Sequence, residues 1–126
     1  MWCSRALVYM PSFLGVSLDE KDFHRKLRHL KIPPSNWPTY HVQHHAHATT
    51  HWFETKDKSA CIVCMGSMKG KTRAQIAALV AHEATHIWQF TVQNIGEAEP
   101  SKEFMAYGIQ NITQTILGAI WKEKNT

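Results

Sequence analysis

Residues 72–96, TRAQIAALVAHEATHIWQFTVQNIG, form the longest run of helix-forming residues in the chain. Thr72 and Gln75 have the spacing of a capping box, in which two side chains satisfy backbone N–H groups at a helix start. From Thr72 to about Val92 the run contains no glycine or proline, and Gly96 suits the left-handed conformation that closes many helices. This stretch therefore predicts one long, capped helix, around which the rest of the fold is arranged.

A second helix is predicted directly after the first, from about Ser101 to Trp121. Its apolar residues recur at helical spacing, which indicates a buried face. Only a short link, Glu97 to Pro100, separates the two helices, and short connections favour antiparallel packing. We therefore expect the second helix to fold back along the first. The apolar stripe consists of Met105, Ile109, Ile112, Ile116 and Ile120.

The residues before the long helix predict two strands and one further helix. Residues 48–55 (ATTHWFET) are rich in threonine and aromatic side chains, and residues 60–65 (ACIVCM) are apolar, so together they predict a β-hairpin. Ser17 and Glu20 form another capping box, which predicts a helix that Pro33-Pro34 ends. This order of elements predicts an α+β fold, with a small antiparallel β-sheet packed on the long helix and on the antiparallel helix that follows.

Length and composition are typical of a single globular domain spanning residues 1–126. The chain has 126 residues, of which 44% are hydrophobic, and a net charge of +4, which does not by itself predict nucleic-acid binding. Three cysteines do not make a disulfide framework, no apolar run approaches the roughly 20 residues needed to cross a bilayer, and residues 1–16 lack a signal-peptide cleavage pattern. We therefore expect a cytoplasmic protein that does not enter the membrane.

The nine histidines are the unusual feature of this composition. Two of them belong to the sequence His82-Glu83-Ala84-Thr85-His86 within the long helix, which matches the HEXXH pattern. Residues four apart lie on one face of a helix, so His82 and His86 can bind one Zn²⁺, while Glu83 reaches a water molecule rather than the metal. The spacing therefore predicts two zinc ligands and a general base from one turn of helix.

A catalytic zinc ion takes three protein ligands and keeps one position open. Acidic residues occur downstream of the motif at Glu97, Glu99, Glu103 and Glu123. Glu103 lies in the first turn of the second predicted helix, where the backbone holds a carboxylate more rigidly than a link does. We therefore predict Glu103 as the third ligand, with Glu99 as the alternative; for either acid, favourable placement at a helix start is the other interpretation.

The motif HEATH, followed by a glutamate on the next helix, resembles the gluzincin family of zinc metallopeptidases. The stretch VAHEATHIWQ…IGEAEPSKEFMAYGIQNITQ is also similar to small uncharacterised proteins encoded by bacteriophages and prophages. This resemblance covers about residues 48–117. It implies a minimal zincin-like domain, in which the edge strand of a sheet lies beside the active-site helix, and for a phage protein it implies the bacterial host cytoplasm. By position, it implies His82, His86 and Glu103 as ligands and Glu83 as the base.

Further residues are weaker candidates for the same site. Tyr107 follows Glu103 by one helical turn, and His51 lies within the first predicted strand, so either could donate a hydrogen bond to a developing oxyanion. Core packing is the alternative interpretation for both. The histidines between His41 and His51 are interpreted as a solvated cluster, with a second metal site as the alternative. Cys61 and Cys64 are predicted to be buried thiols on opposite sides of a strand.

Together these residues predict a zinc-dependent metallopeptidase that hydrolyses a peptide bond in a peptide or protein substrate. The strand at residues 60–65 is expected to offer backbone groups to an extended substrate. The alternative is a non-catalytic phage or prophage accessory protein whose zinc only stabilises a small fold, and such a site would have four protein ligands. A nucleic-acid-binding module is a third hypothesis that rests on the net charge alone.

Overall fold

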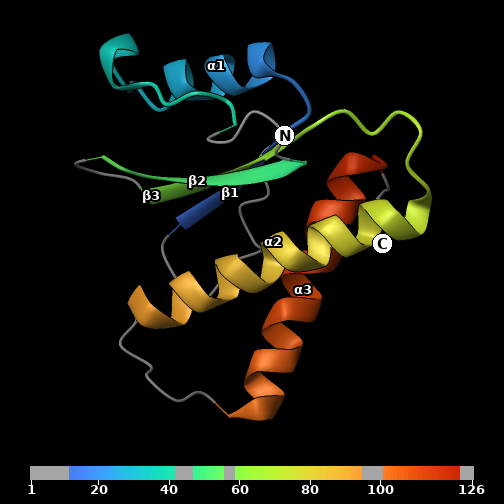
Figure 1. The fold of residues 1–126 in the computed structure, drawn as a ribbon. Helices are drawn as coiled ribbons and strands as arrows, with labels where there is room; N and C mark the ends of the chain where they lie inside the picture. Colours follow the sequence, from blue (N-terminus) through green and yellow to red (C-terminus); the bar gives the residue numbers. More distant parts are fainter. Residues whose placement is uncertain (1–11, 42–46, 56–58, 95–100, 123–126) are drawn as a thin grey trace.

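The computed structural model describes residues 12–41, 47–55, 59–94 and 101–122, and Figure 1 shows their arrangement. A three-stranded sheet has one helix on one face and two helices on the other, which confirms the α+β prediction. The elements in chain order are β1 (Ser12–Ser17), α1 (Glu20–His29), a short 3-10 helix η1 (Pro34–Asn36), β2 (Ala48–Glu54), β3 (Ser59–Met65), α2 (Arg73–Asn94) and α3 (Lys102–Ile120).

The sheet has the strand order β1-β3-β2, with β3 in the centre. β2 pairs antiparallel with β3 and confirms the predicted hairpin, whereas β1 runs parallel to β3. The prediction of an antiparallel sheet is therefore wrong: the sheet is mixed, because β1 was not expected. The prediction that residues 60–65 offer their backbone to a substrate is also wrong, since β3 pairs with a strand on each side. In the described sheet it is β2 that combines an edge position with contacts to α2.

The central strand contributes to two hydrophobic cores, one on each face of the sheet. Cys61 and Val63 pack in the core formed with α2 and α3, while Ile62 and Cys64 pack in the core formed with α1. All four side chains are fully buried, and burial raises the pKa of the Cys64 thiol. Cys61 and Cys64 are not linked in a disulfide and lie in different cores, so the prediction of two buried thiols on opposite sides of a strand is confirmed.

Helix α1 begins two residues later than the capping box predicted. Its N-cap is Asp19, whose carboxylate accepts a hydrogen bond from the backbone N–H of Asp22 at 2.8 Å. Ser17 is instead the last residue of β1 and is buried. Phe23 and Leu27 lie on the inner face of α1 and are fully buried against the sheet, because side chains four residues apart share one face of a helix.

The starts of α2 and α3 form as the sequence predicts. The backbone N–H of Thr72 donates to Gln75 Oε1 at 2.8 Å, and the backbone N–H of Gln75 donates to Thr72 Oγ1 at 3.1 Å. This reciprocal pair is a capping box and fixes where α2 begins. At α3, the backbone N–H of Phe104 donates to Ser101 Oγ at 3.1 Å, so Ser101 caps that helix.

Helix α3 returns antiparallel to α2 and crosses it obliquely (Figure 1). In the second half of α2, the Phe104 ring lies edge-on to the Trp88 ring, with 4.9 Å between ring centroids. At the start of α2, the Arg73 guanidinium lies 4.8 Å from the centre of the Trp121 ring. Trp88 also packs against Gly108, where a Cβ atom would lie 2.2 Å from its ring. The Trp88 ring therefore occupies the space that a larger side chain at position 108 would need.

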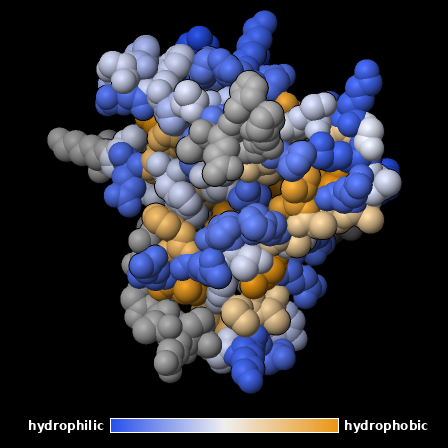
Figure 2. All heavy atoms as spheres, viewed as in Figure 1, coloured by the Kyte–Doolittle hydropathy of each residue, from blue (hydrophilic) through white to orange (hydrophobic). Residues whose placement is uncertain are grey.

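The apolar stripe of α3 is buried over most of its length. Ile112, Ile116 and Ile120 are buried in the core with α2, and Ile109 is half-buried, but Met105 at the start of the helix is 41% exposed. Figure 2 shows one face of the molecule, on which hydrophilic side chains alternate with smaller apolar patches. None of the described helices is long and apolar enough to cross a membrane.

Candidate metal centre

The two histidines of the motif converge at the surface of α2. The Nε2 atoms of His82 and His86 are 3.2 Å apart, and the two rings meet edge to face at 79°. Both side chains are exposed. The convergence follows from the four-residue spacing, because side chains at i and i+4 lie one above the other on a helix. The prediction that these two imidazoles share one face is confirmed.

The separation of the two nitrogens fits a shared metal ion. Zinc binds histidine nitrogen at about 2.0–2.1 Å with tetrahedral geometry, so two nitrogen ligands of one ion lie about 3.3 Å apart. The observed 3.2 Å between His82 Nε2 and His86 Nε2 is close to that value. Without a metal, the same contact is a hydrogen bond in which one ring nitrogen donates and the other accepts, according to the tautomers.

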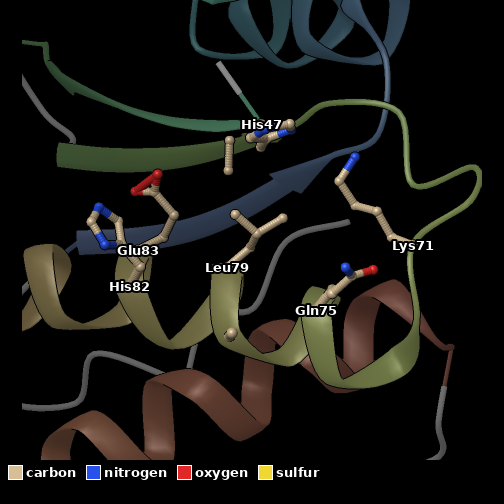
Figure 3. A pocket seen from close by; sticks show the side chains of 8 residues that line it. His47, Lys71, Gln75, Leu79, His82 and Glu83 are labelled. Carbon is tan, nitrogen blue, oxygen red and sulfur yellow. The ribbon is translucent and has the colours of Figure 1, made fainter. Parts of the chain in front are cut away.

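Glu83 points toward the sheet and lies beside His82 (Figure 3). Its side chain is only 7% exposed, and Thr50 Oγ1 donates a hydrogen bond to Glu83 Oε2 at 3.0 Å. Thr50 belongs to β2, so this contact ties the edge strand to the motif helix. A buried carboxylate with a fixed hydrogen-bond donor has a defined orientation, which a general base requires. The role of Thr50 was not predicted from the sequence.

A pocket of about 620 Å³ opens beside Glu83. Figure 3 shows Glu83 and His82 at one end of it, Lys71 at the other, Leu79 between them and His47 on the opposite wall. The pocket lies between the first half of α2, the start of β2 and the loop before α2. Its lining residues are His47, Ala48, Lys71, Gln75, Ala78, Leu79, His82 and Glu83.

Glu103 and Tyr107 lie on the outer face of α3. Both are exposed, Tyr107 by 66%. Glu103 precedes the buried Ile112 by nine residues, which is about two and a half helical turns, so the two side chains point in opposite directions. Tyr107 stands in the same relation to Ile116. The structure does not bring either residue to the histidine pair, and their assignment to the site stays a prediction.

His51 lies on the opposite face of the sheet from Glu83. Its Nε2 is 2.9 Å from the carbonyl oxygen of Tyr40, and its ring stacks on Phe23 of α1 at 5.1 Å between centroids. Successive strand residues point to opposite faces, so when Thr50 faces α2, His51 faces α1. Core packing, the alternative interpretation of His51, matches this placement, and the structure does not bring His51 to the motif.

The histidines near β2 separate into different environments. His41 Nδ1 lies 3.0 Å from Thr49 Oγ1, and burial, together with the charge of His51, lowers the pKa of His41. His47 is exposed and lines the pocket beside Glu83. His44 and His45 lie outside the described residues, as do Glu97, Glu99 and Glu123. Among the described residues, no group of three or more His, Cys, Asp or Glu side chains is arranged to hold a metal ion.

Comparisons with models of protein families, with curated proteins and with solved structures found no match to this chain.

Proposed function

We propose that this chain is a zinc-dependent peptidase in which His82 and His86 bind the metal and Glu83 is the general base. The observation that supports this most directly is the 3.2 Å separation between the two Nε2 atoms, which matches the span of two ligands on one tetrahedral ion. A second support is the pocket, because it brings His82 and Glu83 to the same open space in which a peptide could lie.

The protein's own groups have distinct tasks in this proposal. When bound, zinc polarises the carbonyl group of the peptide bond and makes water more acidic. A Glu83 carboxylate oxygen takes a proton from the attacking water and later passes it to the leaving amine nitrogen. Thr50 holds Glu83 Oε2 through its hydroxyl at 3.0 Å and so directs the carboxylate toward the pocket. Thr50 is therefore a positioning residue for the base.

The third ligand is proposed from the sequence rather than from contacts. The sequence predicts Glu103, with Glu99 as the alternative, because a catalytic zinc ion takes three protein ligands, but the described arrangement does not bring Glu103 to the histidine pair. Glu103 is exposed on α3, and Glu99 lies outside the described residues. The rival function, a phage accessory protein with a structural zinc site, requires four protein ligands and no bound water. The coordination sphere of the zinc-loaded protein therefore separates the two functions.

The test uses zinc content and peptide cleavage in the same preparations. We expect the parent chain to bind one zinc ion and to cleave members of a mixed peptide library, as measured by mass spectrometry. E83Q should keep its zinc and lose cleavage by at least about 100-fold, the lower end of what a general base contributes. E54Q is the matched control, because Glu54 is an exposed carboxylate at the end of β2. Equal cleavage by E83Q and the parent would refute the assignment.

A further inference from the structure

The end of the pocket away from Glu83 is lined by hydrogen-bond donors. Lys71 donates one hydrogen bond, from Nζ to the carbonyl oxygen of Ser67 at 2.8 Å. An ammonium group has three N–H donors, so two remain for a ligand. Within the described residues no carboxylate forms an ion pair with Lys71. This end of the pocket therefore has a positive charge whose acidic partner is not among those residues.

Gln75 adds a further donor near Lys71, and His47 adds a polar side chain on the opposite wall. The Oε1 atom of Gln75 accepts the capping hydrogen bond from the backbone of Thr72, so the NH₂ group is the part of the side chain that a ligand can use. The carbonyl oxygen of His47 accepts a hydrogen bond from the backbone N–H of Gly66 at 2.8 Å, which fixes the start of β2 where its imidazole lines the pocket. Figure 3 shows Lys71 extending toward His47 from the opposite wall.

The two ends of the pocket have opposite chemistry, and the middle is apolar. Glu83 supplies a carboxylate at one end, Lys71 supplies an ammonium at the other, and Leu79 lies between them. The lining also includes Ala48 and Ala78. A ligand carboxylate is attracted to the ammonium group of Lys71. A peptide whose C-terminal carboxylate lies at that end places a bond further along its chain beside Glu83.

We infer that the Lys71 end binds the C-terminal carboxylate of a short peptide substrate. This inference rests on the proposed function, because the bond to be cleaved is placed at Glu83. Gln75 and Glu83 are eight residues apart in α2, which is about 12 Å along the helix axis. An extended peptide covers about 3.3 Å per residue, so three to four residues span that distance. The substrate class is thus a peptide cut three or four residues before its C-terminus.

Binding is measured with the full chain carrying E83Q, which removes the base and prevents turnover from obscuring the result. The probes are the tetrapeptide acetyl-Ala-Ala-Leu-Ala with a free carboxylate, the same peptide as its C-terminal amide, and the amide of acetyl-Ala-Ala-Glu-Ala. The free acid should bind about tenfold tighter than its amide, the size of one partly exposed charge-assisted hydrogen bond. Calorimetric titration gives the three dissociation constants.

Variants at two lysines of one loop test the residue assignment. K71M should abolish the preference for the free acid, K71R should retain most of it, and K69M should leave it unchanged, because Lys69 is exposed in the same loop and does not line the pocket. Equal binding of acid and amide by the E83Q parent would overturn the inference. So would tight binding of the glutamate-containing amide, which would show that any carboxylate suffices, or a preference that persists in K71M.

The same data keep this inference separate from the proposed function. A preference for the free acid that depends on Lys71, in a chain whose zinc-loaded parent cleaves no peptide, would support the carboxylate site and refute the peptidase. Cleavage by the parent with no discrimination between acid and amide would support the peptidase and refute the carboxylate site.

Discussion

The sequence predicted that one turn of α2 and the start of α3 would supply ligands to the same metal ion. In the structure, only the turn of α2 has its side chains arranged for this. The turn from His82 to His86 in α2 brings two imidazole nitrogens to 3.2 Å. Glu103 and Tyr107, in the first two turns of α3, face solvent. Geometry within one helix follows from its period alone, whereas geometry between two helices depends on which faces pack together. The distance between His82 and His86 is therefore determined by five residues of one helix. The distance from Glu103 to these histidines is determined by the packing of both helices.

The packing face of α2 explains the difference. Trp88 packs against α3, and it follows His86 by two residues, which is about 200° around the helix. Helix α3 therefore lies on the side of α2 that faces away from the histidine pair. On α3, the inner face contains Gly108 and Ile112, which leaves Glu103 on the outer face.

The largest expected effect is the loss of zinc on removal of either histidine. H82A and H86A should each weaken zinc binding by more than about 100-fold, since even residues that only support a metal ligand are worth about 10–100-fold. Competition with a chromophoric chelator measures the affinity. H29A is the control, because His29 is an exposed histidine on α1. If either variant keeps the parent's affinity, the turn in α2 is not a metal centre and the comparison with α3 loses its basis.

The next effect concerns the contact that orients α3. G108A should destabilise the fold by about 1–3 kcal/mol, because its Cβ would lie 2.2 Å from a ring carbon of Trp88. G118A is the matched control on the same helix, where a Cβ has no neighbour within 4 Å. It should be neutral or stabilising by up to about 1 kcal/mol, as alanine favours helix over glycine. Urea unfolding of both variants measures the difference; a G108A chain as stable as G118A would show that Trp88 does not fix the helix crossing.

Most helices and strands could be predicted from local sequence patterns. Which face of each element packs against its neighbours could not. The hairpin, the starts of α2 and α3, and the pairing of His82 with His86 on one helix face follow from patterns a few residues long. β1 was not expected, because its residues SFLGVS lie within an apolar N-terminal segment and pair with a strand more than forty residues later. Alternation within β2 predicts that Thr50 and His51 face opposite sides, but it does not say which side meets α2.

Which face of α3 is buried, by contrast, could be predicted from the sequence. The stripe that includes Ile112 and Ile116 predicted the buried face, and counting back nine residues from Ile112 reaches Glu103 on the opposite face. The prediction of Glu103 used its position at the start of the helix and the resemblance to gluzincins, and it did not apply this count.

A smaller effect is expected at Thr50. T50V removes the hydroxyl that donates to Glu83 Oε2 and should lower kcat by about tenfold while zinc affinity stays unchanged, because the base loses one fixing hydrogen bond. T49V is the control on the neighbouring residue of β2, whose hydroxyl lies 3.0 Å from His41 on the other face. Steady-state cleavage and zinc titration are measured for both variants. Equal cleavage by T50V and T49V would show that Thr50 does not position Glu83.

The smallest effect expected from the structure is that of E103A on zinc affinity. Glu103 is exposed on the outer face of α3, so its removal should change the affinity by less than about threefold, the scale of an exposed charge. Chelator competition measures E103A beside E99A, the alternative acid, and H86A. A loss in E103A as large as in H86A would show that zinc draws Glu103 to the pair, as the sequence predicted, and that α3 turns when the metal binds. A loss confined to E99A would assign the third ligand to Glu99 and leave the contrast between the two helices as the structure describes it.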